Sequence, residues 1–218
     1  MRALLVACLT AVLVSCADGD APVEVPGAPE PAVAAPVVAA PPEVCTLSTV
    51  AEGHILTWTA FKFTERVGVE GGFDAITVSA GKPGDAAWKA IDGMKFQIDT
   101  ASVNTGNAER DAKIRKYFFG SSADFGRITG RIKANSPGKA TLFVEMNGQQ
   151  HSVVVDVSAG SDSVRLNGMI DVEQWGAGPA IAALNEVCAA VHTGQDGVRK
   201  LWSEVALAAT IPVERTCR

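Results

Sequence analysis

The chain has 218 residues and a formal net charge of −5 at pH 7. Hydrophobic residues make up 47% of it and charged residues 20%, proportions that exclude a chain disordered throughout. The excess of acidic residues gives no basic surface of the kind that binds nucleic acid or anionic lipid.

The N-terminus has the pattern of an export signal. Met1 and Arg2 form a short positive region, and residues 3–13 are an apolar run too short to span a bilayer. The run ends in Leu13-Val14-Ser15-Cys16, which resembles the lipobox of bacterial lipoproteins. In that family the leader is removed before the cysteine, which is then lipidated. We expect residues 1–15 to be a lipoprotein signal peptide and Cys16 to anchor the chain in the bacterial cell envelope, facing the periplasm. A plain secretory signal cut nearby is the alternative.

Residues 16–44 form a tether that begins at the lipidated cysteine. They consist mostly of proline, alanine, valine, glutamate and glycine, and they have no periodic apolar face that could pack. A segment so rich in proline favours extended polyproline II, with a reach of up to roughly 80 Å. We expect a spacer that holds a folded domain away from a membrane.

Residues 45–218 are long enough to bury about 70% of their unfolded surface around one core. Alternating apolar and polar side chains predict strands at residues 53–63, 94–100, 126–134, 141–146, 149–157, 163–172 and 198–207. Residues 67–79 read as two extended pieces separated at Gly71-Gly72 by a bulge or a tight bend. Helical patterns cover residues 85–92, 107–119 and 179–192.

Asn147-Gly148 is the clearest turn signal, because a type I′ hairpin turn needs positive φ at both central residues. A turn there pairs Met146 with Gln149 and Leu142 with Val153. This register places the apolar residues of both strands on one face, and a slip by one residue would turn them all outward. We therefore expect an antiparallel sheet with one wet face.

The helix that follows residue 107 carries motifs that resemble the YceI-like family of lipocalin-like, polyisoprenoid-binding proteins. The matching residues, with supporting motifs in order along residues 50–211, are Ser102-Val103-Asn104-Thr105-Gly106-Asn107, Arg110-Asp111, Phe118-Phe119, Trp58-Thr59-Ala60, Gly71-Gly72-Phe73-Asp74, Gly168-Met169-Ile170-Asp171-Val172 and Leu201-Trp202. The resemblance implies an all-β fold with short helices, an eight-stranded antiparallel lipocalin-like β-barrel. It also implies an elongated apolar central cavity that takes an isoprenoid chain, such as the tail of a quinone, or another polyprenyl lipid.

Small residues at Ala60, Gly130, Ala134 and Gly168 fall on strand faces otherwise filled by large side chains. Taken alone, they are equally consistent with unfilled space and with bends at barrel corners. The resemblance favours the cavity. Lys62 lies at its mouth if the face it shares with Trp58 points inward, and is a solvated charge otherwise. The expected ligand-binding residues are Trp58, Lys62, Phe96, Ile98, Ile128, Ile132, Leu142, Val144, Val153, Val155, Leu166 and Ile170.

Three cysteines remain after removal of the leader with Cys8 and lipidation of Cys16. In a barrel with an even number of strands, the start of the first strand lies beside the end of the last. Cys45 precedes the first strand and Cys217 follows the last, so we expect a Cys45–Cys217 disulfide. Cys188 then remains as a buried free thiol on an apolar helix face.

No catalytic motif is present in the sequence. His54, His151 and His192 share no metal-ligand spacing, and the chain has no Cys-x-x-Cys, Gly-x-Ser-x-Gly or Walker pattern. The preferred hypothesis is a binding protein, not an enzyme, that sequesters or carries an isoprenoid or fatty amphiphile. The alternative is an envelope lipoprotein with a filled core that acts through protein–protein contacts; a hydrolase has the least support.

Overall fold

The computed structural model describes residues 43–218. The expected signal peptide at residues 1–15, the lipidation site Cys16 and all but the last two residues of the tether lie outside this range. Within residues 43–218, no helix combines the length and the apolar character needed to cross a membrane.

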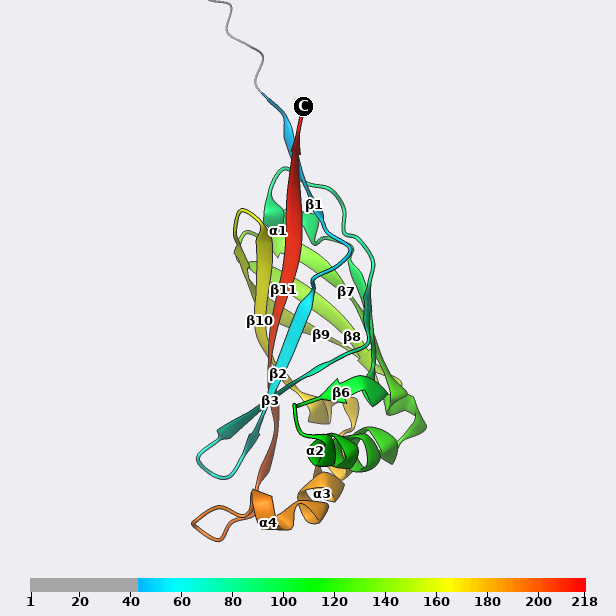
Figure 1. Cartoon of the computed structure of the whole chain (residues 1–218), viewed down its shortest axis with the longest axis vertical. Helices are drawn as coiled ribbons and strands as arrows, with labels where there is room; N and C mark the ends of the chain where they lie inside the picture. Colours follow the sequence, from blue (N-terminus) through cyan, green and yellow to red (C-terminus); the bar gives the residue numbers. More distant parts are fainter. Residues whose placement is uncertain (1–42) are drawn as a thin grey trace, which may run out of the picture. The chain divides into compact units, whose positions relative to one another are not determined.

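Eleven strands and a few short helices make up the described chain (Figure 1). The strands are β1 (Cys45–Thr49), β2 (Ile55–Lys62), β3 (Val67–Phe73), β4 (Ile76–Val78), β5 (Lys95–Asp99), β6 (Val103–Asn104), β7 (Arg127–Ser136), β8 (Lys139–Met146), β9 (Gln149–Ala159), β10 (Ser163–Asp171) and β11 (Leu201–Cys217). The helices are α1 (Ala87–Ala90), α2 (Ala108–Lys113), α3 (Gly178–Val187) and α4 (Ala189–His192). Single turns are η1 (Thr100–Ser102), the π-helical η2 (Ile114–Phe118), η3 (Phe119–Ser121), η4 (Ala123–Gly126) and η5 (Val172–Trp175).

All strand pairs are antiparallel and belong to one curled sheet with the order β4-β5-β7-β8-β9-β10-β11-β2-β3-β6. Its two ends adjoin, because β3 continues into β4 while β6 pairs with β3 and β5 pairs with β4. Backbone hydrogen bonds bridge the two bends, from Asp74 N to the Ser102 carbonyl and from Asp99 N to the Ala75 carbonyl. If β3–β4 and β5–β6 are counted as two bent strands and β1 is set aside, eight strands surround the interior. The predicted lipocalin-like fold is confirmed, with a finer division of its strands.

The hairpin of β8 and β9 has the predicted register. Asn147 and Gly148 adopt φ values of 51° and 68°, and Met146 pairs with Gln149 while Leu142 pairs with Val153. The inward-facing Leu142 and Met146 are buried, whereas Val154 on the other face is 63% exposed. Local turn chemistry and hydrophobic alternation therefore agree on one arrangement.

The predicted bulge or tight bend at Gly71-Gly72 is wrong, because β3 runs through both glycines to Phe73. Gly71 pairs with Trp58, and a Cβ atom at residue 71 would overlap the Trp58 indole. The glycine therefore makes room for an aromatic ring on the neighbouring strand, and the chain bends only after Phe73.

The last strand extends ten residues beyond its predicted end at 207. Pro212 lies where β11 leaves β2, whose last pair is Ile55 with Thr210, and begins to pair with β1 at Thr49 and Val213. The Val213 N–H donates to the Asp162 carbonyl on one side of β11. The Pro212 nitrogen therefore faces the other side, where the partner strand changes from β2 to β1. Its missing donor therefore interrupts no ladder there.

The filled core occupies the part of the barrel that α1 covers, where α1 contacts β1, β7, β9 and β10. Ile91, Met94 and Val164 are almost completely buried there, as are Ala90 and Val155. The side chains at this end of the barrel are therefore closely packed.

Cys45 and Cys217 form a disulfide bond across the paired ends of β1 and β11. The bond joins residues separated by 172 positions, so it closes nearly the whole described chain into a loop. Cys188 is a buried free thiol between α3 and α4, at the point where the single helix predicted for residues 179–192 divides into two.

Replacing both cysteines (Cys45→Ser with Cys217→Ser) is expected to lower the free energy of unfolding by about 2–4 kcal/mol, because the unfolded chain regains conformational entropy. Denaturant unfolding followed by circular dichroism measures the change. A reducing agent should destabilise the unaltered protein and leave the double variant unchanged. Equal stability of the two proteins would contradict the expectation.

Candidate functional site

An apolar cavity of about 250 Å³ lies inside the barrel. Strands from opposite walls of the barrel line it, together with η2, η3 and α3. Among the described residues that line it, none carries a permanently charged side chain, and His54 and Thr210 are the polar exceptions to a wall of aliphatic and aromatic groups. Such a surface offers a ligand dispersion contacts and removal from water.

Nine of the twelve sequence-predicted site residues meet around this cavity. They come from the inward faces of five strands, β2, β5, β7, β8 and β10, as the alternation requires; they are Trp58, Phe96, Ile98, Ile128, Ile132, Leu142, Val144, Leu166 and Ile170. Because these residues are separated by more than 100 positions in sequence, closure of the sheet is what brings them together.

Val153 and Val155 do not line the cavity, contrary to the prediction. The helical segments α1 and η5 pack against β9, and the Trp175 ring of η5 stacks edge-on against His151, 5.1 Å between centroids. Trp175 is completely buried, and its Nε1 donates to the Val144 carbonyl at 3.2 Å. The buried Val155 side chain instead packs against β10 at Gly168.

Lys62 also lies away from the cavity. Its Nζ donates to the Val191 carbonyl in α4 at 3.0 Å and stands 4.6 Å from the centre of the Phe63 ring. The strand therefore presents Leu56, Trp58 and Ala60 to the cavity, while the lysine amine satisfies a carbonyl near the end of a helix. The mouth position predicted for this lysine is wrong.

Three of the four small residues, Gly130, Ala134 and Gly168, do not line the cavity. A Cβ atom at Gly130 would meet the Phe96 ring and the Phe143 carbonyl, and one at Gly168 would meet the Val155 side chain. Neighbouring side chains already fill both spaces. Ala60 does line the cavity, as does Ala209 on β11, so alanines contribute the room that the glycines do not.

Helical side chains form one part of the lining that was not predicted from the sequence. Ile114 and Phe118 come from η2, Phe119 from η3, and Ile181 and Leu184 from α3. The apolar spacing on both helices was the available signal, but spacing alone does not distinguish a helix face packed on a core from one that closes a cavity.

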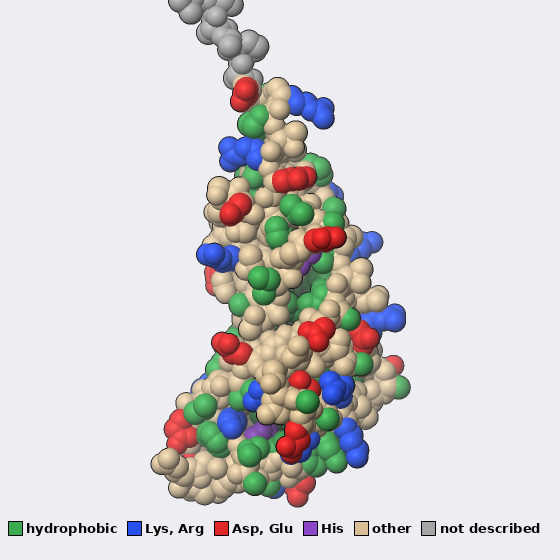
Figure 2. Space-filling view, in the orientation of Figure 1, with side chains coloured by type: hydrophobic (Ala, Val, Ile, Leu, Met, Phe, Trp, Pro, Cys, Tyr) green, Lys and Arg blue, Asp and Glu red, His purple; other side chains and the backbone are tan. Residues whose placement is uncertain are grey.

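The barrel wall is open on one side between β2 and β4. Trp58–Lys62 pair with β3, but within residues 43–218 nothing pairs with residues 55–57 on the side opposite β11. Leu56 on one edge and Ile76 and Val78 on the other all line the cavity. We call this gap, between residues 54–57 and β4, the side window. Figure 2 shows hydrophobic side chains gathered in a recess on the face that carries β2.

The side window has well-fixed borders. At one end the Gly81 N–H donates to Thr49 Oγ1 at 3.0 Å. At the other, Trp58 Nε1 donates to the Gly72 carbonyl at 3.3 Å, and its ring lies 6.5 Å from that of Phe73. The opening is therefore a defined feature of the wall.

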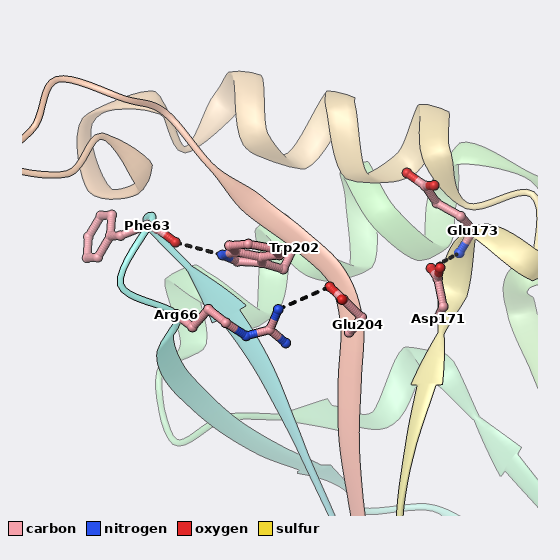
Figure 3. A network of polar contacts seen from close by, with 6 residues as sticks. All are labelled: Phe63, Arg66, Asp171, Glu173, Trp202 and Glu204. Carbon is pink, nitrogen blue, oxygen red and sulfur yellow. Dashed lines mark hydrogen bonds and ion pairs between the residues drawn. The ribbon is translucent and has the colours of Figure 1, made fainter. Parts of the chain in front are cut away.

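Far from the window along β2, polar contacts fix Trp202, which also lines the cavity (Figure 3). Its Nε1 donates to the Phe63 carbonyl at 2.6 Å, and the Arg66 guanidinium stands 4.3 Å from its ring centre while pairing with Glu204 at 3.4 Å. Phe63 and Arg66 adopt positive φ values of 62° and 56°, which are uncommon for such residues. The strained turn thus joins the β2–β3 connection to β11.

His54 differs from the rest of the lining. Its Nδ1 is buried and, within the described chain, has no hydrogen-bond partner. Burial lowers the pKa of His54 below its ordinary value, and the nearby backbone of Val50 and Ala51 acts against that shift. The neutral imidazole is therefore favoured at neutral pH.

Metal binding has little support in the described residues. The one close group of metal-ligand side chains among residues 43–218 is Glu43, Cys45 and Cys217, and its two cysteines are consumed by the disulfide.

Comparison with known proteins identifies a matching family and solved structures with a similar fold. A family model described as YceI-like domain matches residues 48–211. A polyisoprenoid binding domain from Saccharophagus degradans is 15% identical with a TM-score of 0.54, over 79% of this chain and 98% of that one. BcnA of Burkholderia cenocepacia is 16% identical with a TM-score of 0.52, over 74% and 96%. A YceI protein of Campylobacter jejuni is 19% identical with a TM-score of 0.50, over 72% and 90%. No curated protein matches the sequence.

The Gly71→Ala substitution is expected to displace the Trp58 ring from the cavity wall and to cost about 1–3 kcal/mol of stability, because the added methyl group overlaps the indole. Thermal unfolding and tryptophan fluorescence measure the two effects. Gly126→Ala is the matched control, since a Cβ atom there meets nothing within 4 Å. Similar behaviour of the two variants would refute the role assigned to Gly71.

Proposed function

This chain belongs to the YceI-like family, and we propose that its cavity binds the hydrocarbon chain of a polyisoprenoid or a similar amphiphile. The observation that carries the proposal is the apolar cavity itself, enclosed by strands and helices and reached through the side window. The solved structure from Saccharophagus degradans is a polyisoprenoid binding domain with the same fold, which supports this ligand class.

Burial of hydrocarbon supplies the binding energy. Each methylene transferred from water contributes about 0.8 kcal/mol, so a long chain binds without many polar contacts. The aromatic rings of Trp58, Phe118 and Phe119 give a flat, branched chain extensive contact. Such a protein sequesters or carries its ligand; the lining supplies one imidazole and one hydroxyl, and the proposal assigns no reaction to them.

The alternative of a filled core acting through protein contacts is weaker for a specific reason. The packed side chains concentrate at the end covered by α1, while large inward residues such as Phe96 and Ile128 are only half-buried. A filled interior would bury them completely.

Substituting Phe for Ala209 should reduce ligand binding, because Ala209 lines the cavity and the ring would occupy it. Ala208→Phe is the matched control, since the neighbouring alanine is exposed on the other face of β11. Organic extraction of each purified protein followed by mass spectrometry measures bound lipid. We expect a prenyl lipid with the unaltered protein and with Ala208→Phe, and several-fold less with Ala209→Phe.

Purified protein that yields no lipid and takes up no added prenyl chain would refute the proposed function. Equal lipid in the two phenylalanine variants would place binding outside the cavity.

We further propose that the chain is a membrane-anchored lipoprotein of the bacterial cell envelope. The support is the sequence Leu13-Val14-Ser15-Cys16 after an apolar leader, followed by a proline-rich tether. A tether of this kind would give the domain room to meet a membrane from which an insoluble ligand is taken, while a multi-chain anchor prevents its loss.

Metabolic labelling with an alkynyl fatty acid tests the anchor. The unaltered protein should be labelled and recovered with membranes, and Cys16→Ala should be unlabelled, because the thiol is the acylated group. Labelling of the alanine variant, or an unlabelled native protein that retains Cys16, would contradict this proposal without affecting the cavity.

A further inference from the structure

The inner wall of the cavity has one polar side chain that follows the inward alternation. Leu56, Trp58 and Ala60 line the cavity from β2, and His54 precedes them with the same two-residue spacing. Thr210 pairs with Ile55, on the opposite face of β11 from the inward Ala209. His54 is therefore the polar group directed toward a ligand in this wall.

The backbone around His54 is fixed. Gly53 adopts φ +79°, a conformation that favours glycine, and the Val50 N–H donates to the Pro212 carbonyl at 3.0 Å. β2 begins directly after His54, with Ile55 paired to Thr210. The position of the imidazole at the edge of the side window is thus set by the fold.

His54 Nδ1 is the one buried side-chain nitrogen or oxygen in the described chain without a hydrogen-bond partner. A buried polar atom without a partner costs free energy, and native proteins keep few of them. An imidazole nitrogen accepts or donates one hydrogen bond according to the tautomer, so it matches a hydroxyl or a carbonyl equally.

The charge of the wall restricts the head group. Within the described lining there is no lysine or arginine to pair with a carboxylate or a phosphate. Burial also favours the neutral imidazole. An anion in this cavity would lose its hydration without gaining a counter-charge, which is costly, whereas an uncharged oxygen needs one hydrogen bond.

We infer that His54 is the head-group anchor of the cavity and selects amphiphiles whose polar end is an uncharged hydroxyl or carbonyl. The head then lies at the side window, with the hydrocarbon chain running toward Trp202 and α3. This inference rests on the proposed function, because it assigns an orientation and a head-group class to a ligand held by its tail.

The test compares three ligands with one hydrocarbon skeleton: geranylgeraniol, the same chain without its hydroxyl, and geranylgeranyl phosphate. A change in the intensity or wavelength of tryptophan fluorescence reports binding, since Trp58 and Trp202 line the cavity. The unaltered protein should bind the alcohol about tenfold more tightly than the hydrocarbon, equivalent to about 1.4 kcal/mol. The phosphate should bind more weakly than the alcohol.

His54→Leu should lower affinity for the alcohol to that for the hydrocarbon and leave the hydrocarbon unchanged, while His54→Gln should retain part of the preference. Leu56→Ala is the matched control on the same face, and it should weaken both ligands alike. Thermal unfolding of each variant verifies that it is folded.

Equal affinity of the unaltered protein for alcohol and hydrocarbon would overturn the inference, as would tighter binding of the phosphate or an unchanged preference in His54→Leu. In each of these outcomes hydrocarbon binding persists, so the proposed function stands. Failure of the unaltered protein to bind any of the three ligands would refute the proposed function and this inference together.

Discussion

Closure of one antiparallel sheet on itself is the constraint on which the rest of the structure depends. An open sheet leaves two rows of unpaired backbone groups, and a curled sheet satisfies them by bringing its edges together. Here β3 and β4 provide the junction, since one pairs with β6 and the other with β5. Once the sheet is closed, every second side chain points into a common interior, whatever its distance along the chain.

The interior is filled unevenly, and helices decide where. At one end α1 covers side chains that pack tightly, and at the opposite end of β9 η5 places Trp175 against His151. Toward the other end α3 and η2 lie over the barrel with their apolar residues at its lining, so they close a space without filling it. The same closed sheet thus supplies a packed core and a cavity.

The strands and most of their inward residues could be predicted, because alternation and turn chemistry are local. Leu142 and Ile132 needed no knowledge of partners: the period of two places them on the inner face. The errors come from features that depend on distant residues. Val155 faces inward as predicted, but it lies over Gly168. Lys62 shares the inward spacing, yet its amine finds a helix carbonyl 129 residues away. The family resemblance indicated that a cavity exists, whereas the residues at its boundary are decided by contacts between distant parts of the chain.

A cavity reduces the packing energy of the domain, so other interactions must stabilise the folded state. Atoms that line unfilled space lack the close contacts of a packed core, which weakens the part of the barrel around them. Restraints lie at both ends of the barrel: the Cys45–Cys217 disulfide joins the ends of the described chain on the side of α1, and Arg66 with Phe63 fixes Trp202 at the other end. A bound hydrocarbon would restore the missing contacts, and binding to the folded state alone would stabilise it in proportion to the logarithm of ligand concentration. Ligand binding and fold stability are therefore coupled through the same apolar wall.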